Sequence, residues 1–382
     1  MNNVDDEQVD EQVEQDEQDE QVEQEPGKPR IAITGATGLV GSHAVEHFVK
    51  AGYPVVALVR GPGSAEHLIE LNNSQEGAQL KLVQATLNDS DSLRQAFNEV
   101  DIVIHAAGTV NPYGARDQIF ATNVGGTKNT LAAAKLAHVQ QFIFISSLSV
   151  ITGQGDQFDV DESAPLRPCG EPYADSKIEA EKTVMAEAAN INVTSLRPGF
   201  IYGPRERSWM PRLIANIKNG KAMLIDGGGR ETNVIYVGSL CRAIEATVLN
   251  TRAFRQVYNL TDGQKTTKKQ LFDAIADGLG LPRVTKSVPR PVARLACQVV
   301  SSIAPMLSPD SQQKLSRFSR GAFRLAAVNQ GFNIGKAEKD LRYTDRIPFS
   351  EGMALTLEFF KAAQAQEKKK ESATDLSAAR RR

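Results

Sequence analysis

The sequence has little cysteine and few aromatic side chains. Its three cysteines, Cys169, Cys241 and Cys297, stand far apart and form no CxxC pair, so we expect a reducing compartment without disulfides or structural zinc. The five histidines do not cluster with cysteine, and we expect no metal site. Aromatic residues make up 6% of the chain and no helix-turn-helix pattern occurs, so we expect no nucleic-acid partner.

Long apolar runs are also lacking. The start shows no basic segment followed by an apolar one, so we expect no secretory signal. The uncharged stretch 295–309 contains Pro305 and is too short to span a bilayer as a helix. We therefore expect a cytoplasmic protein.

The net charge of -2 conceals an uneven distribution. Residues 1–25 contain 12 acidic residues and no lysine or arginine, which leaves 34 acidic against 44 basic residues in the remainder. A body with this basic excess suits an anionic ligand or an anionic surface.

Composition divides the chain into four parts. Residues 1–27 repeat Asp, Glu, Gln and Val, and we expect a disordered acidic tail there and a basic flexible tail over 363–382. We expect 28–204 to form a dinucleotide-binding Rossmann domain, to which segments from 205–260 return. The remaining part, 205–362, is expected to form a substrate-binding lobe.

Short β-branched runs alternate with helix-like segments in the first domain. These runs are Arg30–Thr34, Pro54–Val59, Leu80–Gln84, Asp101–His105, Gln141–Ile145 and Val193–Leu196. Continuous apolar runs indicate strands buried on both faces. We therefore predict an α/β fold, with a doubly wound parallel sheet of the Rossmann type and a smaller C-terminal α+β substrate lobe.

A glycine-rich loop directly follows the first of these runs. Gly35, Gly38 and Gly41 form G-x-x-G-x-x-G before a helix predicted over Ser42–Lys50. The first glycine would allow a sharp turn, the second a close approach to a pyrophosphate, and the third close packing of the helix. The strand before the loop and the helix after it favour dinucleotide binding over a purely structural turn.

The second strand ends without the acidic residue that is typical of NAD sites. No Asp or Glu occurs between Ala51 and Ala65, and Arg60 stands near the expected position. Arg60, helped by Ser64, would pair with a 2′-phosphate, so we favour NADP(H) over NAD(H) as the cofactor. The alternative is a solvent-facing Arg60 with NAD bound through its ribose.

Further motifs follow in a characteristic order. They are His105-Ala106-Ala107-Gly108, Asn123-Val124-Gly125-Gly126-Thr127, Ser146-Ser147, Tyr173-x-x-x-Lys177 and Leu196-Arg197-Pro198-Gly199-Phe200-Ile201-Tyr202-Gly203-Pro204. With the glycine loop, they resemble the extended short-chain dehydrogenase/reductase superfamily over about residues 30–362, nearest the 3β-hydroxysteroid and sterol-4-carboxylate dehydrogenase branch. Order and spacing carry the resemblance, because Tyr-x-x-x-Lys alone is a weak motif.

The resemblance implies a set of contacts with the dinucleotide. The residues expected to bind it are Gly35, Ala36, Thr37, Gly38, Leu39, Val40, Gly41, Arg60, Thr86, Leu87, Ala106, Ala107, Gly108, Asn123, Tyr173, Lys177, Pro198, Gly199 and Ile201. Two positions depart from the family pattern, because Thr86 and Gly238 stand where the family usually has Asp. We expect an altered adenine contact at the first and a local structural effect at the second.

The resemblance also implies the catalytic residues Ser147, Tyr173, Lys177 and Asn123. Hydride transfer to a carbonyl needs a proton at the same oxygen, which Tyr173 would supply. Lys177, one helical turn further, would lower the phenol pKa and hold the nicotinamide ribose. Ser147 would orient the substrate oxygen. Asn123 would fix either the helix geometry or a water in a proton relay.

The serine assignment has two alternatives. Ser146 or Ser149 would take the place of Ser147 if the register of the motif were shifted. The hydroxyl of Ser147 could instead cap the end of the strand.

Residues 291–306 carry apolar side chains at helical spacing, and basic residues follow. One interpretation is peripheral contact with a membrane surface through 290–325; the other is a helix packed on the lobe with a solvated basic face. The expected partner is an apolar small-molecule substrate. The sequence is also compatible with a homodimer.

These features predict an NAD(P)-dependent oxidoreductase. It would act on the hydroxyl/ketone pair of a bulky apolar molecule, such as a sterol or steroid or a long-chain β-keto compound. One alternative is a nucleotide-sugar epimerase or dehydratase, for which arginines could hold the diphosphate, namely Arg205, Arg207, Arg212 and Arg230. A second alternative is a dinucleotide-binding sensor without catalysis.

Overall fold

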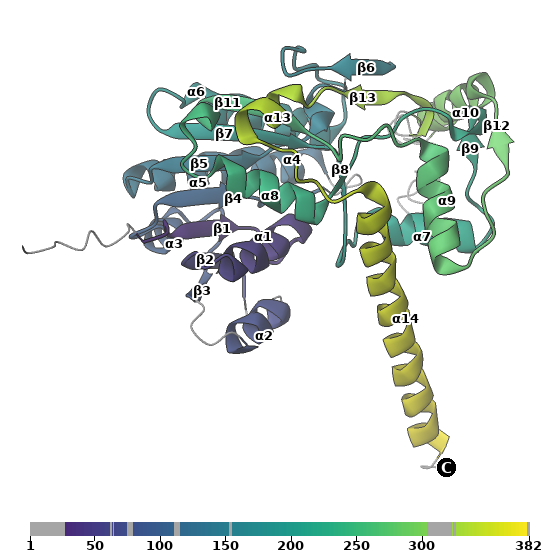
Figure 1. Cartoon of the computed structure of the whole chain (residues 1–382), viewed down its shortest axis with the longest axis horizontal. Coiled ribbons are helices and arrows are strands. Elements are labelled where there is room, and N and C mark those ends of the chain that lie inside the picture. The colour runs from purple at the N-terminus through teal and green to yellow at the C-terminus, as the bar shows by residue number, and fades with distance from the viewer. Residues whose placement is uncertain are drawn as a thin grey trace, which may run out of the picture.

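A seven-stranded parallel sheet forms the centre of the computed structural model, which describes residues 27–61, 63, 65–74, 79–110, 115–152, 155–303, 323 and 326–379 (Figure 1). From one edge to the other, its strands are β11 (Gln256–Leu260), β7 (Asn192–Pro198), β5 (Gln141–Ile145), β4 (Ile102–His105), β1 (Ile31–Thr34), β2 (Val55–Val59) and β3 (Leu80–Gln84). The chain order reverses between β1 and β4, and ligands of doubly wound sheets bind at such a reversal.

Helices cover both faces of this sheet, and therefore β1, β2 and β5 are buried throughout. One apolar core contains α1 (Leu39–Lys50), α2 (Glu66–Ser74), α8 (Val237–Thr247) and α13 (Gly335–Leu341). The core on the other face contains α3 (Ser90–Ala96), α5 (Gly126–Leu136) and α6 (Pro172–Ala186). This arrangement confirms the predicted Rossmann sheet and the six strands expected from the sequence.

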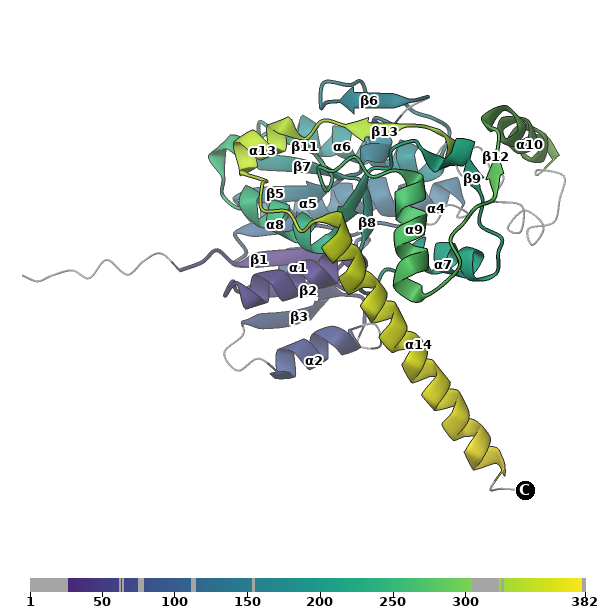
Figure 2. The ribbon, with the colours of Figure 1, turned by 45° about the vertical axis from the view of Figure 1, so that its right-hand side comes forward.

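A smaller lobe lies beside the C-terminal edge of the sheet (Figure 2). Its elements are β8 (Phe200–Tyr202), α7 (Met210–Lys218), β9 (Leu224–Ile225), β10 (Val234–Tyr236), α9 (Lys268–Leu279), β12 (Ser287–Val288), α10 (Arg290–Ile303) and the first turns of α14 (Phe349–Ala379). Parallel pairing joins β8 to β10 and β9 to β12. The lobe has an apolar core of its own, which includes Met210, Ile275 and Leu357.

Several shorter elements complete the described part of the chain. They are α4 (Arg116–Phe120), the π-helical turn Ala121–Gly125, the 3₁₀ turns Leu148–Val150, Asp226–Gly228 and Thr251–Ala253, β6 (Gln157–Val160) and β13 (Gln330–Phe332). The last two strands pair with each other across the long sequence interval that contains the lobe. No helix in the described part of the chain combines the length and the apolarity needed to cross a membrane.

One helix begins earlier than predicted, and another occupies a segment for which we predicted no helix. The helix predicted from Ser42 begins at Leu39, because the tight turn closed by Gly38 N–H and Gly35 O, 2.9 Å apart, lets it start at once. The backbone over 363–379 belongs to α14, where we expect a flexible tail; its alanine, glutamate, lysine and glutamine residues favour helix. Of the expected acidic tail, 1–26 lie outside the described residues.

The buried carboxyl group of Asp262 joins the sheet to the lobe. It follows β11, and it accepts hydrogen bonds from the Tyr202 hydroxyl and from the Tyr236 backbone N–H, each at 2.8 Å. These partners belong to β8 and β10. Burial raises the pKa of Asp262 to about 6, and both hydrogen bonds and the charge of Arg346 oppose that rise.

We expect this carboxyl group to make stability depend on pH. Its pKa is raised in the folded protein, so its contribution is present in full below the ordinary Asp pKa and is lost as pH rises through about 6. Relative to the wild type, Asp262→Asn should therefore gain about 2–3 kcal/mol in free energy of unfolding between pH 4 and pH 7. Urea unfolding of both proteins at the two pH values measures this difference. A difference that does not vary with pH would contradict the expectation.

Candidate active site

The glycine loop after β1 forms a cradle for an anion. Gly35 has a φ of 68°, and a Cβ there would lie 2.7 Å from the backbone of Ala107. A Cβ on Gly41 would lie 2.1 Å from Gly35 O, so helix α1 packs directly on the turn. Gly38 caps α1 without a side-chain hydrogen bond, and no acidic residue occupies the first turn. The N–H groups at this helix start are thus available to phosphate, and the loop fits a dinucleotide.

The other residues expected to bind the cofactor lie at the ends of neighbouring strands. Arg60 follows β2 and is exposed; Ser64, its expected helper, lies outside the described residues. Thr86 follows β3 and is also exposed, while the carbonyl of Leu87 accepts a hydrogen bond from Asn129 Nδ2 at 2.8 Å. Because parallel strands end at one edge, these positions lie at the same edge of the sheet as the glycine loop, where doubly wound folds bind ligands in a crevice.

The segments after β4 and β7 also reach this crevice. A Cβ on Gly108 would lie 3.3 Å from Asn123 Oδ1 and 3.5 Å from Lys177 Nζ, so this turn touches the candidate catalytic residues. Pro198 ends β7 and is buried. The N–H of Gly199 donates to Leu260 O at 2.9 Å, which leads the chain from the sheet toward the lobe.

Ser147, Tyr173 and Lys177 come together where the end of β5 meets the first turns of α6. The hydroxyl group of Ser147 lies close enough to that of Tyr173 to lower the phenol pKa, and Ser147 Oγ accepts from the N–H of Ser149 at 3.1 Å. Lys177 Nζ donates to Ile145 O at 2.8 Å. The three residue types that the resemblance implies are thus assembled around one strand end.

The alternative serines have different surroundings. Within the described residues, the hydroxyl groups of Ser146 and Ser149 are buried and have no hydrogen-bond partner. Ser147 is the member of this set that contacts the tyrosine. It also caps the 3₁₀ turn Leu148–Val150, since its hydroxyl accepts from the N–H of Ser149.

Burial controls the protonation of Tyr173 and Lys177. It raises the pKa of Tyr173, and only the Ser147 hydrogen bond opposes this. It lowers the pKa of Lys177 to about 8, and the negative charge of Glu181 opposes this. The lowering of the phenol pKa that we expected from Lys177 is not among these effects. With its amine donating to Ile145 O, Lys177 leaves the phenol of Tyr173 protonated at neutral pH.

Asn123 has a structural position in the π-helical turn between α4 and α5. Its Oδ1 accepts from Thr109 N at 2.7 Å, and its Nδ2 donates to Thr109 O at 3.1 Å and to Ser176 Oγ at 2.9 Å. The side chain is 2% exposed, and these contacts use its oxygen and both of its donors. Of the two roles considered for Asn123, this geometry supports the fixing of helix and turn.

A buried ion pair below Lys177 was not anticipated. Arg197 Nη2 and Nε donate to Glu181 at 2.6 and 3.1 Å, and Ser195 Oγ donates to the same carboxylate at 2.9 Å. Glu181 lies one helical turn beyond Lys177, so the spacing of the two residues in the sequence was a usable signal. The pair fixes α6 against β7 and keeps a negative charge near the buried amine.

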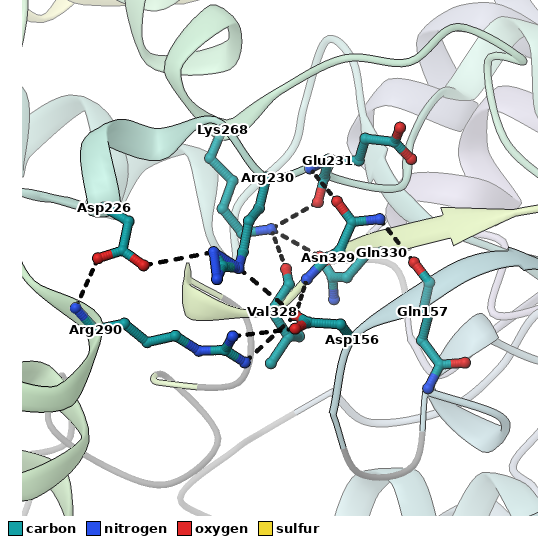
Figure 3. Close-up of polar contacts among 10 residues, drawn as sticks. All are labelled: Asp156, Gln157, Asp226, Arg230, Glu231, Lys268, Arg290, Val328, Asn329 and Gln330. Atoms are coloured by element: carbon teal, nitrogen blue, oxygen red, sulfur yellow. Dashed lines mark hydrogen bonds and ion pairs between the residues drawn. The ribbon is translucent and has the colours of Figure 1, made fainter.

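The segment that follows Ser147 is tied to the lobe through Asp156 (Figure 3). Its carboxylate accepts from Arg290 Nη1 at 3.0 Å, at the start of α10, and from the N–H of Asn329 at 2.8 Å. The amine of Lys268 donates to Glu231 O at 2.8 Å and to Val328 O at 2.9 Å. Asp156 lies in the chain segment between Ser147 and Tyr173. Through this network, that segment is joined to the start of α10 and to the residues just before β13, and both of these are joined to the lobe.

Comparison with models of protein families assigns the part of the chain that contains the sheet and the glycine loop to a known family. Residues 31–261 match the model of the NAD dependent epimerase/dehydratase family. The chain belongs to that family, which confirms the extended short-chain dehydrogenase/reductase resemblance, and it is an NAD(P)-dependent oxidoreductase of this type.

Curated relatives are distant but match most of the chain. A 2-alkyl-3-oxoalkanoate reductase of Shewanella oneidensis is 26% identical over 335 residues, 84% of each chain. The 4-hydroxy-2-methyl-3-oxo-4-farnesyl-3,4-dihydroquinoline-1-oxide ketoreductase of Stigmatella aurantiaca is 28% identical, over 85% of this chain and 94% of its own. A decarboxylating sterol-4-alpha-carboxylate 3-dehydrogenase of Schizosaccharomyces pombe is 29% identical, over 73% and 84%.

Solved structures share the fold. The UDP-glucose 4-epimerase of Thermotoga maritima, solved with UDP-glucose, superposes with a TM-score of 0.69 at 19% identity, over 88% of this chain and 99% of its own. The dTDP-glucose 4,6-dehydratase of Streptomyces venezuelae, solved with NAD, gives 0.69 at 21%, over 88% and 98%. At this identity the likeness establishes the fold alone.

Proposed function

We propose that the protein reduces the ketone of a bulky apolar molecule, either a long-chain β-keto compound or a sterol, and oxidises the corresponding alcohol in the reverse direction. The assembly of Ser147, Tyr173 and Lys177 beside the glycine loop carries this proposal. The names of the relatives add support, because two of them are ketoreductases or oxoalkanoate reductases and one acts on a sterol.

Each residue of the triad has a part in the proposed reaction. A nicotinamide, when bound, supplies or accepts the hydride at carbon. The Ser147 hydroxyl holds the substrate oxygen, and Tyr173 O–H gives its proton to that oxygen as the carbonyl becomes an alcohol. Lys177 keeps its amine on Ile145 O and thereby holds the first turns of α6, which carry Tyr173, over the end of β5. Burial keeps Tyr173 protonated at neutral pH, which favours its use as the acid in ketone reduction.

The nucleotide-sugar alternative has weaker support than ketone reduction, because two of the arginines proposed to hold the diphosphate already pair with carboxylates. Arg205 pairs with Glu46 at 2.8 Å. Arg230 lies 3.6 Å from Asp156 and 3.5 Å from Asp226. A diphosphate would have to compete with these carboxylates for both cations, which costs part of the binding energy.

Tyr173→Phe should abolish turnover without loss of dinucleotide binding. The phenyl ring keeps the packing, but no proton donor remains for the substrate oxygen, so we expect kcat to fall by a factor of roughly 10²–10⁴. Turnover of β-keto esters, steroid ketones and flavanonols is measured as NADPH and NADH oxidation. Turnover of UDP-sugars is measured as product formation by chromatography, because an epimerase or dehydratase consumes no net dinucleotide. Dinucleotide binding is measured by calorimetry. Full turnover in the variant would remove Tyr173 from the mechanism. Turnover by the wild type of UDP-sugars alone would favour the epimerase class.

We further propose that NADP(H) is preferred over NAD(H). No acidic residue follows β2 to accept hydrogen bonds from the ribose hydroxyls, and the exposed guanidinium of Arg60 is available for a 2′-phosphate.

Arg60→Ala should then weaken NADPH binding by about tenfold or more and leave NADH binding unchanged, because only NADPH carries the phosphate that Arg60 would contact. Calorimetric titration of both nucleotides gives the two Kd values. Arg283→Ala, an exposed arginine of the lobe, is the matched control for the change in net charge. If the wild type binds NADH more tightly than NADPH, the proposed preference is wrong.

The exposed face of α10 supports a third proposal, that this helix contacts an anionic membrane surface. Val292, Leu295, Val299 and Ile303 share one face, and their exposed fractions are 56%, 63%, 53% and 44%. No acidic residue occurs over 278–309, so this segment itself carries a net positive charge. The following basic residues, Lys314, Arg317, Arg320 and Arg324, lie outside the described residues.

Flotation with vesicles of phosphatidylserine and phosphatidylcholine tests this contact. The wild type should float with the vesicles, and Leu295→Gln combined with Val299→Gln should remain in solution, because the change removes apolar area from the exposed face. Leu136→Gln changes an equally exposed leucine on α5 and should leave flotation unaltered. Wild-type protein that stays in solution would disprove membrane contact.

A further inference from the structure

A series of buried side chains, connected by hydrogen bonds, lies next to the candidate active site. Ala107 N–H lies 3.3 Å from Thr34 Oγ1, and Thr34 Oγ1 lies 2.8 Å from His105 Nδ1. His105 Nε2 lies 3.0 Å from Thr127 Oγ1, which lies 2.6 Å from Asn123 O. The side chains of these threonines, the histidine and the asparagine are at most 2% exposed, so each polar atom depends on its protein partner.

The distances determine the direction of every hydrogen bond in this series. Asn123 O carries no proton, so the short contact of 2.6 Å requires Thr127 to donate its only hydroxyl proton there. Thr127 can then only accept from His105, so Nε2 carries a proton. In a neutral ring Nδ1 is the acceptor, and the Thr34 hydroxyl donates to it. Thr34 in turn accepts from Ala107 N–H.

The imidazole ring of His105 is neutral for two physical reasons. It is completely buried, and the amine of Lys177 is close enough to disfavour a second positive charge. Together these effects lower the pKa of His105 to about 3. A charged ring would also have two donors, and Thr34 would lose the acceptor for its own proton.

The series continues from Asn123 to the catalytic helix. Asn123 Nδ2 donates to Ser176 Oγ at 2.9 Å, and Ser176 Oγ donates to the carbonyl oxygen of Tyr173 at 2.7 Å. At the other end, Thr34 directly precedes Gly35, whose backbone packs against Ala107. The hydrogen bonds thus run in one direction from the glycine loop to the first turn of α6.

We propose that His105, as its neutral Nε2–H tautomer, is a positioning residue that couples the dinucleotide loop to the helix that carries Tyr173 and Lys177. It sets the spacing between the two walls of the crevice, so a shift of the loop on dinucleotide binding is transmitted to the backbone of Tyr173. The inference rests on the proposed function of the same site, but the tautomer can be measured without any substrate.

Nuclear magnetic resonance of the full chain tests the tautomer. With ¹⁵N-histidine labelling, long-range ¹H–¹⁵N correlation spectra should show one of the five histidines as a neutral Nε2–H ring that does not titrate between pH 5 and 9. The signal is assigned by its loss in His105→Gln. If that variant does not fold, it is assigned by replacing His43, His47, His67 and His138 in turn. An Nδ1–H ring or a titrating ring at this position would overturn the proposal.

Substitutions at Thr127 test the coupling. Thr127→Val removes the hydroxyl that joins His105 to Asn123, and we expect a loss of about 2- to 10-fold both in NADPH affinity and in kcat. Thr127→Ser keeps the hydroxyl and should restore both. The matched control is Thr130→Val on the same helix, because Thr130 is also completely buried and donates to the carbonyl of Gly126 at 2.7 Å but does not belong to the series.

The comparison of these variants decides the matter. Thr127→Val and Thr130→Val should differ in NADPH affinity and kcat when both are measured below the temperature at which either variant begins to unfold. Equal affinity and kcat in the two variants would show that the series has no role beyond local helix stability, and the coupling would be wrong. If no substrate is turned over, the proposed function fails, whereas the tautomer and the NADPH affinities still test the inference separately.

Discussion

The buried ammonium group of Lys177 is the constraint on which the candidate site depends. A cation without water needs acceptors or other stabilising groups, and this one has Ile145 O at 2.8 Å and the ring of Phe144 with its centroid at 4.8 Å. Both groups belong to the end of β5, so α6 is held with its first turns over that strand. Ser147 follows the same strand end, and Tyr173 lies one helical turn before the lysine. The contacts that stabilise the Lys177 ammonium group therefore also bring Ser147 and Tyr173 close to it.

The crevice has a second wall that depends on backbone contact rather than charge. The backbone of Gly35 packs against Ala107, and Gly41 packs on Gly35, so β1, β4 and α1 approach more closely than side chains would allow. His105 stands behind this contact and connects it by hydrogen bonds to the turn that contains Asn123. The polar side-chain atoms of Thr34, His105 and Thr127 are all paired, which makes the spacing between the two walls well defined.

The lobe is attached by polar contacts as well as by its apolar core. Asp156 holds the start of α10 and the segment before β13, while Asp262 holds β8 and β10 at the end of β11. Both carboxylates lie on segments that lead out of the sheet. The position of the lobe at the C-terminal edge of the sheet therefore depends on these two carboxylates as well as on apolar packing.

Local pattern was sufficient for much of this protein. Continuous β-branched runs specify strands buried on both faces, and the spacing of Gly35, Gly38 and Gly41 after a strand specifies the phosphate loop, because both signals depend on neighbours in the chain. The order of the motifs also placed Ser147, Tyr173 and Lys177 in one site. The tertiary structure alone decided the protonation of Tyr173, the direction of the Lys177 amine, the partners of Asn123 and the buried pair of Glu181 with Arg197. These depend on burial and on contacts between segments far apart in the sequence, and no local pattern records the solvent that a side chain loses when such segments pack together.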